Sequence, residues 1–137
     1  MLTRQMTATA TAAVAIALLA ACAGSPTDPV ASARELDGAP AWVHQPTARN
    51  CGQAEVSSRG ELPQAAKRCL DRAVGVGQTG TLAFIRKTTE GGSGVSFVLV
   101  DGTAVKVASI LNDDSYGGGG GWNEQSCTTV AALPDCR

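Results

Sequence analysis

Apolar residues follow a helical repeat in one stretch of the chain, residues 60–77. Apolar or small residues recur there at Leu62, Ala65, Ala66, Cys69, Leu70, Ala73 and Val74, and the polar residues between them are Gln64, Lys67, Arg68, Asp71 and Arg72. Because residues three and four apart share one face of an α-helix, the pattern predicts an amphipathic helix with one buried face. Pro63 is tolerated in its first turn, and Gly75 and Gly77 mark its end.

Three stretches after this helix are typical of β-strands, at residues 81–88, 95–100 and 103–110. Residues 90–94 are rich in glycine and form a loose turn between the first two. Asp101-Gly102 separates the last two strands and is a strong signal for a two-residue hairpin turn. The pattern therefore predicts an antiparallel three-stranded meander.

Pairing through this turn sets Val100 opposite Thr103, and it sets Val98 opposite Val105. Since side chains alternate along a strand, one face carries Val98, Val100, Val105 and Val107, and the other carries Val95, Phe97, Leu99, Ala104 and Ala108, with Lys106 opposite Phe97. Both faces are largely apolar, and one helix covers only one of them. We expect the C-terminal tail or the segment before residue 48 to help cover the second face. The pattern leaves open which face the helix takes.

The N-terminal segment reads as an export signal, with Arg4 ahead of an apolar run at residues 12–21 that is too short to span a bilayer. The run ends in Leu19-Ala20-Ala21-Cys22, which resembles the lipobox of bacterial lipoproteins. The resemblance implies that residues 1–21 are removed as a signal peptide and that the thiol of Cys22 receives a diacylglyceryl group. Two acyl chains give stable anchoring, and an N-acyl chain such as palmitate adds a third. The alternative is an ordinary secretory signal in which Cys22 is incidental.

Residues 22–47 carry four prolines and many small residues with no sustained period. This composition predicts a flexible Pro/Ala-rich tether, followed by one small domain at residues 48–137. Trp42 is expected to dock onto that domain, and the alternative places it near the lipid headgroups. His44 is the single histidine of the chain and is expected to be solvated.

Four cysteines remain after Cys22, and an even number in a small exported domain predicts two disulfides. Three pairings are possible, of which we favour the local one, Cys51 with Cys69 and Cys127 with Cys136. Zinc ligation is the alternative, but no pair has the C-x2-C spacing of a zinc knuckle. Trp122 is expected to anchor the tail on the domain. Residues 125–133 are expected to form a short strand or turn closed by the last disulfide.

Charge and length limit the range of functions. The chain has 137 residues and a formal net charge of −1, and its lysines and arginines alternate with acidic residues. A single domain without a cationic stripe is not expected to bind nucleic acid, because phosphate neutralisation needs clustered cations.

Candidate chemistry is sparse. Asp113 and Asp114 lie in an oxygen-rich stretch, but they lack the order of residues of an EF-hand, so a turn is favoured over a calcium site. The glycine run at residues 117–121 lacks the lysine and hydroxyl residue of a phosphate-binding loop. A serine or cysteine hydrolase needs a positioned histidine, and His44 lies in the expected tether. The sequence therefore predicts no enzyme, no cofactor and no bound metal.

Several short motifs are together similar to small lipoproteins of high-GC Gram-positive bacteria. They are Cys51-Gly52, Cys69 on the helix, Gly77-Gln78, Thr89-Glu90-Gly91 and the stretch from Asp113 to Gly117 ahead of the terminal cysteine. The resemblance spans most of residues 51–136 and implies location and fold, with no activity attached to it.

Together these observations predict an α+β fold, in which one amphipathic helix packs on a small, disulfide-stapled antiparallel sheet of three or four strands. The expected protein is a lipoprotein held at the extracytoplasmic face of the cell membrane by the lipid on Cys22. We expect it to act as a binding or accessory module for an envelope protein or a small ligand. The alternatives are a small secreted hydrolase and a calcium-stabilised surface module.

Overall fold

The computed structural model describes residues 28–89, 91–112 and 121–137 of the chain. Its elements are the helix α1 (Pro29–Arg34), the 3₁₀ helix η1 (Ala41–His44), the strand β1 (Arg49–Glu55), the helix α2 (Gln64–Gly75), the strands β2 (Gly80–Lys87), β3 (Ser93–Asp101), β4 (Ala104–Asn112) and β5 (Asn123–Cys127), and the 3₁₀ helix η3 (Val130–Ala132). The strands form one five-stranded sheet in the order β1-β2-β3-β4-β5. β1 and β2 pair in parallel, and all other neighbours pair antiparallel.

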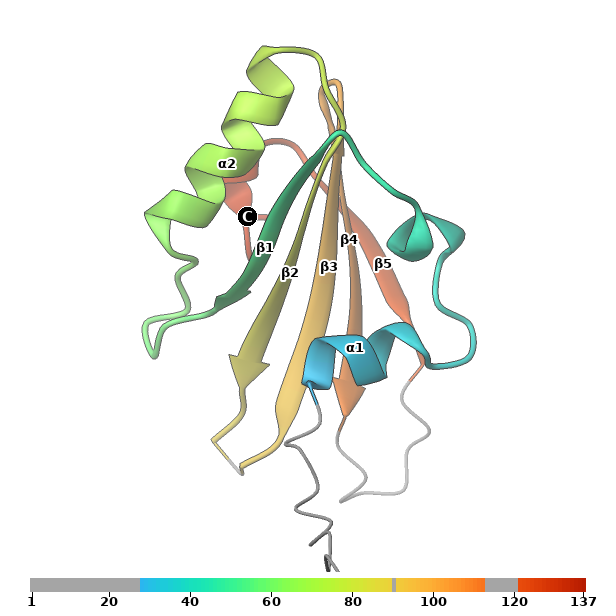
Figure 1. Ribbon diagram of the computed structural model, residues 1–137. Coiled ribbons are helices and arrows are strands. Elements are labelled where there is room, and N and C mark those ends of the chain that lie inside the picture. Colours follow the sequence, from blue (N-terminus) through green and yellow to red (C-terminus); the bar gives the residue numbers. More distant parts are fainter. Residues whose placement is uncertain (1–27, 90, 113–120) are drawn as a thin grey trace, which may run out of the picture.

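Helical segments lie on both faces of this sheet (Figure 1). α2 connects β1 to β2 and covers one face, whereas α1 and η1 lie against the other. The α+β class and the main helix agree with the prediction. The sheet has one strand more than the largest number expected, because β1 precedes α2 and joins the edge of the meander.

The predicted amphipathic helix is confirmed as α2, which begins directly after Pro63. Its inward residues belong to a core formed by Val56, Leu62, Ala66, Leu70, Ala73, Leu82, Phe84, Val98, Val100, Val105, Val107, Cys127, Val130 and Leu133. Leu70 is fully buried, and its burial alone contributes about 2 kcal/mol. α2 therefore takes the valine face of the hairpin, which the sequence pattern left open.

The register of the β3–β4 hairpin differs from the prediction. Val98 lies opposite Val107, and Asp101 pairs with Ala104, so the loop residues are Gly102 and Thr103. Gly102 has a φ of 58°, whereas Thr103 keeps a negative φ. A turn with one positive φ at its first position favours glycine there, and this moves Asp101 into the strand. The pairing of β3 with β4 is shifted from the predicted register by an even number of residues, so each side chain stays on its predicted face.

The segment expected to be a flexible tether is packed on the sheet from Asp28 onward. α1 and η1 bury residues in a second core that comprises Val30, Ala33, Val43, Ala83, Val95, Phe97, Ala108 and Ile110. Trp42 packs against this core, as the docking prediction requires. The two-sided apolar sheet explains the difference, because its second face removes apolar surface from water only if another segment covers it. Residues 22–27 of the expected tether lie outside the described part of the chain.

The strand β1 was not predicted. Its residues, RNCGQAE, are mostly polar and alternate between half-buried and exposed positions without an apolar repeat. The register with β2 is irregular between Asn50 and Gln53, where a β-bulge interrupts the pairing. Edge strands with a bulge have little hydrophobic pattern, so their position depends on tertiary pairing that a single sequence does not reveal.

Both predicted disulfides are confirmed. Cys51 of β1 is bonded to Cys69 of α2 with a Cα–Cα distance of 5.8 Å, and Cys127 is bonded to Cys136 with a Cα–Cα distance of 4.5 Å. These bonds use all four cysteines that zinc ligation would have needed. The first disulfide fastens the unpatterned edge strand to the helix that crosses over from it.

Replacing both Cys51 and Cys69 by alanine should lower the free energy of unfolding by roughly 3 kcal/mol, because it opens an 18-residue loop in the unfolded chain. Urea unfolding followed by circular dichroism measures this loss. Mass spectrometry of the non-reduced wild type should find no free thiol at the four bonded positions. Free thiols at these cysteines would contradict the disulfide assignment.

Gly80 marks the closest approach of α2 to the sheet, and it gives a second prediction. A Cβ at Gly80 would lie 2.8 Å from the Cβ of Ala73 and 3.0 Å from a methyl group of Val100. Gly80→Ala should therefore lower the free energy of unfolding by about 1–3 kcal/mol. Gly75→Ala is the matched control, since a Cβ there meets nothing within 4 Å. Its stability should stay unchanged or rise by up to about 1 kcal/mol, and equal losses in both variants would contradict the packing described.

Candidate functional site

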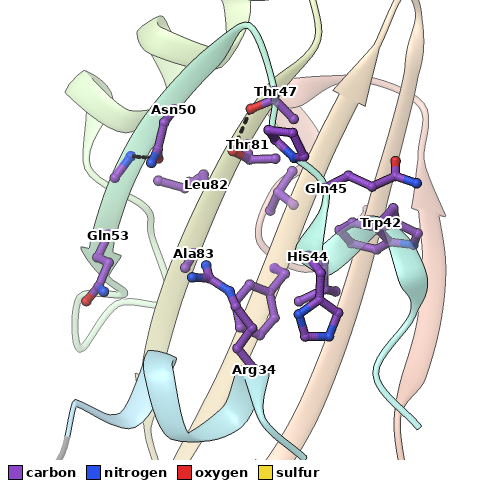
Figure 2. A pocket seen from close by; sticks show the side chains of 15 residues that line it. Arg34, Trp42, His44, Gln45, Thr47, Asn50, Gln53, Thr81, Leu82 and Ala83 are labelled. Carbon is purple, nitrogen blue, oxygen red and sulfur yellow. Dashed lines mark hydrogen bonds between the residues drawn. The ribbon is translucent and has the colours of Figure 1, made fainter.

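A pocket of about 530 Å³ opens on the sheet face that α1 and η1 cover incompletely (Figure 2). We call it the Arg34 pocket, and it is lined by Arg34, Trp42, Val43, His44, Gln45, Pro46, Thr47, Asn50, Gly52, Gln53, Thr81, Leu82, Ala83, Phe97 and Val98. Its walls come from α1, η1, the segment after η1, and the strands β1, β2 and β3. The volume lies in the range of sites that hold small organic ligands.

The floor of the Arg34 pocket is the sheet itself. Odd-numbered residues of β2 and β3 point to this face, which places Thr81, Ala83 and Phe97 beneath the pocket. The guanidinium carbon of Arg34 lies 5.3 Å from the centre of the Phe97 ring. This cation–π contact holds the positive charge of α1 against the floor.

The β1 wall owes its shape to the bulge. Gly52 adopts a φ of 77°, and its N–H donates to Oδ1 of Asn50 at 2.8 Å. Gln53 follows on the same strand, and its side-chain amide donates to Oδ2 of Asp28 at 3.1 Å. The second bond joins β1 to the start of α1, so the two elements border the pocket as a connected frame.

The remaining walls are also fixed by side-chain hydrogen bonds. The hydroxyl groups of Thr47 and Thr81 lie 3.0 Å apart, and Thr47 also donates to the carbonyl of Arg49. The indole N–H of Trp42 donates to a carboxylate oxygen of Glu124 on β5 at 3.2 Å. Residues distant in sequence therefore hold the segment from η1 to β1 in place.

Trp122 supports the same face from the other end of the chain. Its ring centre lies 5.9 Å from that of Phe97, and its indole N–H donates to the carbonyl of Asp37 at 3.2 Å. The expectation that Trp122 anchors the tail is confirmed by these contacts. Trp122 therefore stabilises the pocket floor, because it packs against the Phe97 ring that the guanidinium of Arg34 also contacts.

Hydrogen bonds to Asp28 hold the pKa of its carboxyl below the ordinary value of 3.8. The bond from the Gln53 amide is the larger cause, the bond from the backbone N–H of Val30 comes next, and the positive charge of Arg34 adds a smaller effect. Asp28 thus stays ionised at neutral pH, where it caps α1 and orients Gln53.

The lining of the Arg34 pocket is polar and apolar in about equal parts, and it carries one fixed charge. Arg34 is its only lining residue with a full positive charge, and none of the lining residues is acidic. His44 is exposed at the rim, as expected, and the hydrogen bonds of the described residues include none between it and a hydroxyl or thiol group. Within the described ranges, no three His, Cys, Asp or Glu side chains are grouped to hold a metal ion.

Cys22, Asp113 and Asp114 lie outside the described residues. The pocket residues Arg34, Asn50 and Gln53 were not singled out from the sequence. One signal could have found the first of them, because Asp28-Pro29 is the N-cap and first-turn proline of a helix start, and α1 carries Arg34 in its last turn.

A second pocket of about 430 Å³ lies on the α2 face, between the ends of β2 to β5 and the C-terminal tail. Its lining includes Arg86 and Asp135, which form an ion pair with each other. The hydroxyl groups of Ser96 and Ser109 at its base lie 2.8 Å apart and satisfy one another. The two charges and the two serine hydroxyls are therefore already partnered within the protein, whereas the buried hydroxyl of Thr88, which also lines this pocket, has no hydrogen-bond partner among the described residues.

No family model, no curated protein and no solved structure matches the chain. None of the described helices is long and apolar enough to cross a membrane.

The depressed pKa of Asp28 predicts how stability depends on pH. A carboxyl whose pKa is lower in the folded state contributes stability above its unfolded pKa, and this contribution is lost as the pH falls through the folded pKa. Asp28→Asn keeps the cap and removes the charge. The difference in unfolding free energy between wild type and Asp28→Asn should be constant above about pH 5 and shrink below pH 3.8.

Thermal unfolding at a series of pH values measures this difference. Asp71→Asn, on the exposed side of α2, is the control for loss of a negative charge elsewhere on the surface. A pH of roughly 2.5 lies below most carboxyl pKa values. A difference in unfolding free energy between wild type and Asp28→Asn that stays constant down to about this pH would contradict the role of Asp28.

Proposed function

We propose that the chain is a lipid-anchored extracytoplasmic binding module, which takes a small polar ligand into the Arg34 pocket. The observation that carries this proposal is the pocket itself, an open site bordered by polar side chains and fixed by hydrogen bonds between distant segments. Anchoring rests on Leu19-Ala20-Ala21-Cys22, the lipobox-like sequence that precedes the described residues.

The way the walls are fixed supports binding. Ordering side chains at a site opposes association, so a site whose walls are already held loses less free energy when a ligand arrives. Here Trp42, Thr47 and Gln53 are each bonded to a residue on another element. The apolar floor beneath polar walls is the usual composition of a small-molecule site.

The two disulfides support an extracytoplasmic location. Disulfides persist in oxidising compartments and are rare in the cytosol. Both bonded pairs fasten segments with little apolar pattern, β1 and the C-terminal tail, onto the core. A domain of this size benefits from such bonds, because its core is small.

Lipidation gives a direct prediction. Cells that express the wild-type chain with a radiolabelled fatty acid should yield a labelled protein in the membrane fraction, and Cys22→Ala should abolish the label. The double variant Cys127→Ala/Cys136→Ala is the control, since it removes thiols without touching the lipobox and should keep the label. Persistent labelling of Cys22→Ala would overturn the proposed anchor.

Ligand binding is tested by filling the pocket. Native mass spectrometry of the full chain, after incubation with a small-molecule extract of the cell envelope, should detect a retained compound. Gln53→Trp places a large side chain in the Arg34 pocket and should lower retention at least about tenfold. Gln125→Trp is the matched control, because Gln125 is also an exposed glutamine on an edge strand and lines the second pocket.

Two outcomes would contradict the binding proposal. One is a wild type that retains no compound, and the other is equal retention by the wild type and Gln53→Trp. Retention lost in Gln125→Trp alone would move the site to the second pocket.

A further inference from the structure

We infer that the ligand of the Arg34 pocket is a small organic anion, whose carboxylate or phosphate group binds the Arg34 guanidinium. This inference rests on the proposed function and adds the chemical class of the ligand. Three features of the pocket carry it, namely a cation without an ion-pair partner among the described residues, an amide donor toward the other end and an apolar floor between them.

The charge of Arg34 is not balanced by an ion pair among the described residues. The two ion pairs there join Arg86 to Asp135 and Lys87 to Glu55. The arginine of the second pocket is thus paired, whereas that of the Arg34 pocket is not. The contact of Arg34 with Phe97 involves the ring face and uses none of the five N–H donors of the guanidinium.

Two carboxylates that are hydrogen-bonded to lining residues of this pocket already have partners. Asp28 accepts hydrogen bonds from Val30 and Gln53, and Glu124 accepts one from Trp42. Asp28 lowers the positive potential at Arg34, but it does not line the pocket. An incoming carboxylate or phosphate can therefore form the two parallel N–H to O bonds that a guanidinium offers.

Asn50 supplies the second polar group. Because its Oδ1 accepts the N–H of Gly52, the orientation of the amide is fixed and its NH₂ group is left as a donor. Asn50 and Arg34 lie toward opposite ends of the pocket in Figure 2, with Ala83 between them. The pocket thus fits an elongated molecule with an anion at one end and a hydrogen-bond acceptor at the other.

The probes follow from this arrangement. N-acetylleucine carries a carboxylate, a carbonyl acceptor and an apolar side chain, and N-acetylleucinamide is the same molecule without the charge. Glycerol 3-phosphate provides the phosphate arm. Binding to the full chain, purified in detergent, is followed by intrinsic fluorescence, since one of the two tryptophans lines the pocket and the other touches its floor.

N-acetylleucine, glycerol 3-phosphate or both should produce a saturable change in tryptophan fluorescence. The affinity of that anion should be at least about tenfold higher than the affinity of the neutral amide. Arg34→Gln should weaken binding of that anion by about tenfold to hundredfold. Arg34→Lys should recover part of the loss, because it restores the charge but not the paired donors. Arg72→Gln changes net charge equally on the exposed side of α2, and it should leave the affinity unchanged.

Saturation by the carboxylate alone, the phosphate alone or both identifies which anion the site accepts. Equal affinity for N-acetylleucine and its amide, no saturable response to any probe, or an affinity that Arg34→Gln leaves unchanged would overturn the inference. The inference that the ligand is an anion would also fail if the wild type retained a neutral compound from the envelope extract and Gln53→Trp lost it. The proposed binding function would stand in that case. The proposed function fails separately, when the wild type retains nothing from that extract.

Discussion

Burial of β3 on both of its faces is the constraint on which the rest of the fold depends. Every residue of this strand from Gly94 to Val100 is buried. A half-exposed hairpin needs one apolar layer, whereas this strand needs two, because its alternating side chains enter separate cores. α2 supplies the first layer as an ordinary crossover helix, and α1 and η1 supply the second from a segment whose composition resembles a linker. The packed part of the chain therefore includes the described residues before residue 48, from Asp28 onward.

The two layers cover their faces of the sheet to different extents, and this difference creates the site. α2 is twelve residues long and packs closely enough to require glycine at position 80. α1 and η1 have six and four residues and cover only part of the opposite face. The uncovered part lies beneath Arg34 and beside the β1 bulge, where polar side chains meet an apolar floor. Incomplete coverage thus leaves a pocket in which hydrogen bonds, instead of close packing, hold the walls.

The sequence predicted the elements whose patterns are local. The helical repeat gave α2, alternation and the Asp101-Gly102 signal gave the hairpin, and cysteine spacing suggested the observed disulfides. It missed β1, whose pairing depends on a distant strand and a bulge, and it missed α1, whose short apolar face is hidden among prolines and alanines. The Arg34 pocket draws on both missed elements. Its residues could not be grouped from the sequence, because Arg34 and Gln53 belonged to segments without a predicted position.

The packing of the chain from Asp28 onward limits how far the domain can lie from a lipid anchor at Cys22. With Cys22 lipidated as proposed, six residue steps separate the anchor from Asp28, the cap of α1. A fully extended chain of that length spans at most about 20 Å, where a free segment as far as residue 47 would have allowed roughly four times as much. A domain anchored in this way would stay in the layer next to the headgroups. Molecules that diffuse along the membrane surface would meet its pocket more often than molecules in the bulk of the envelope.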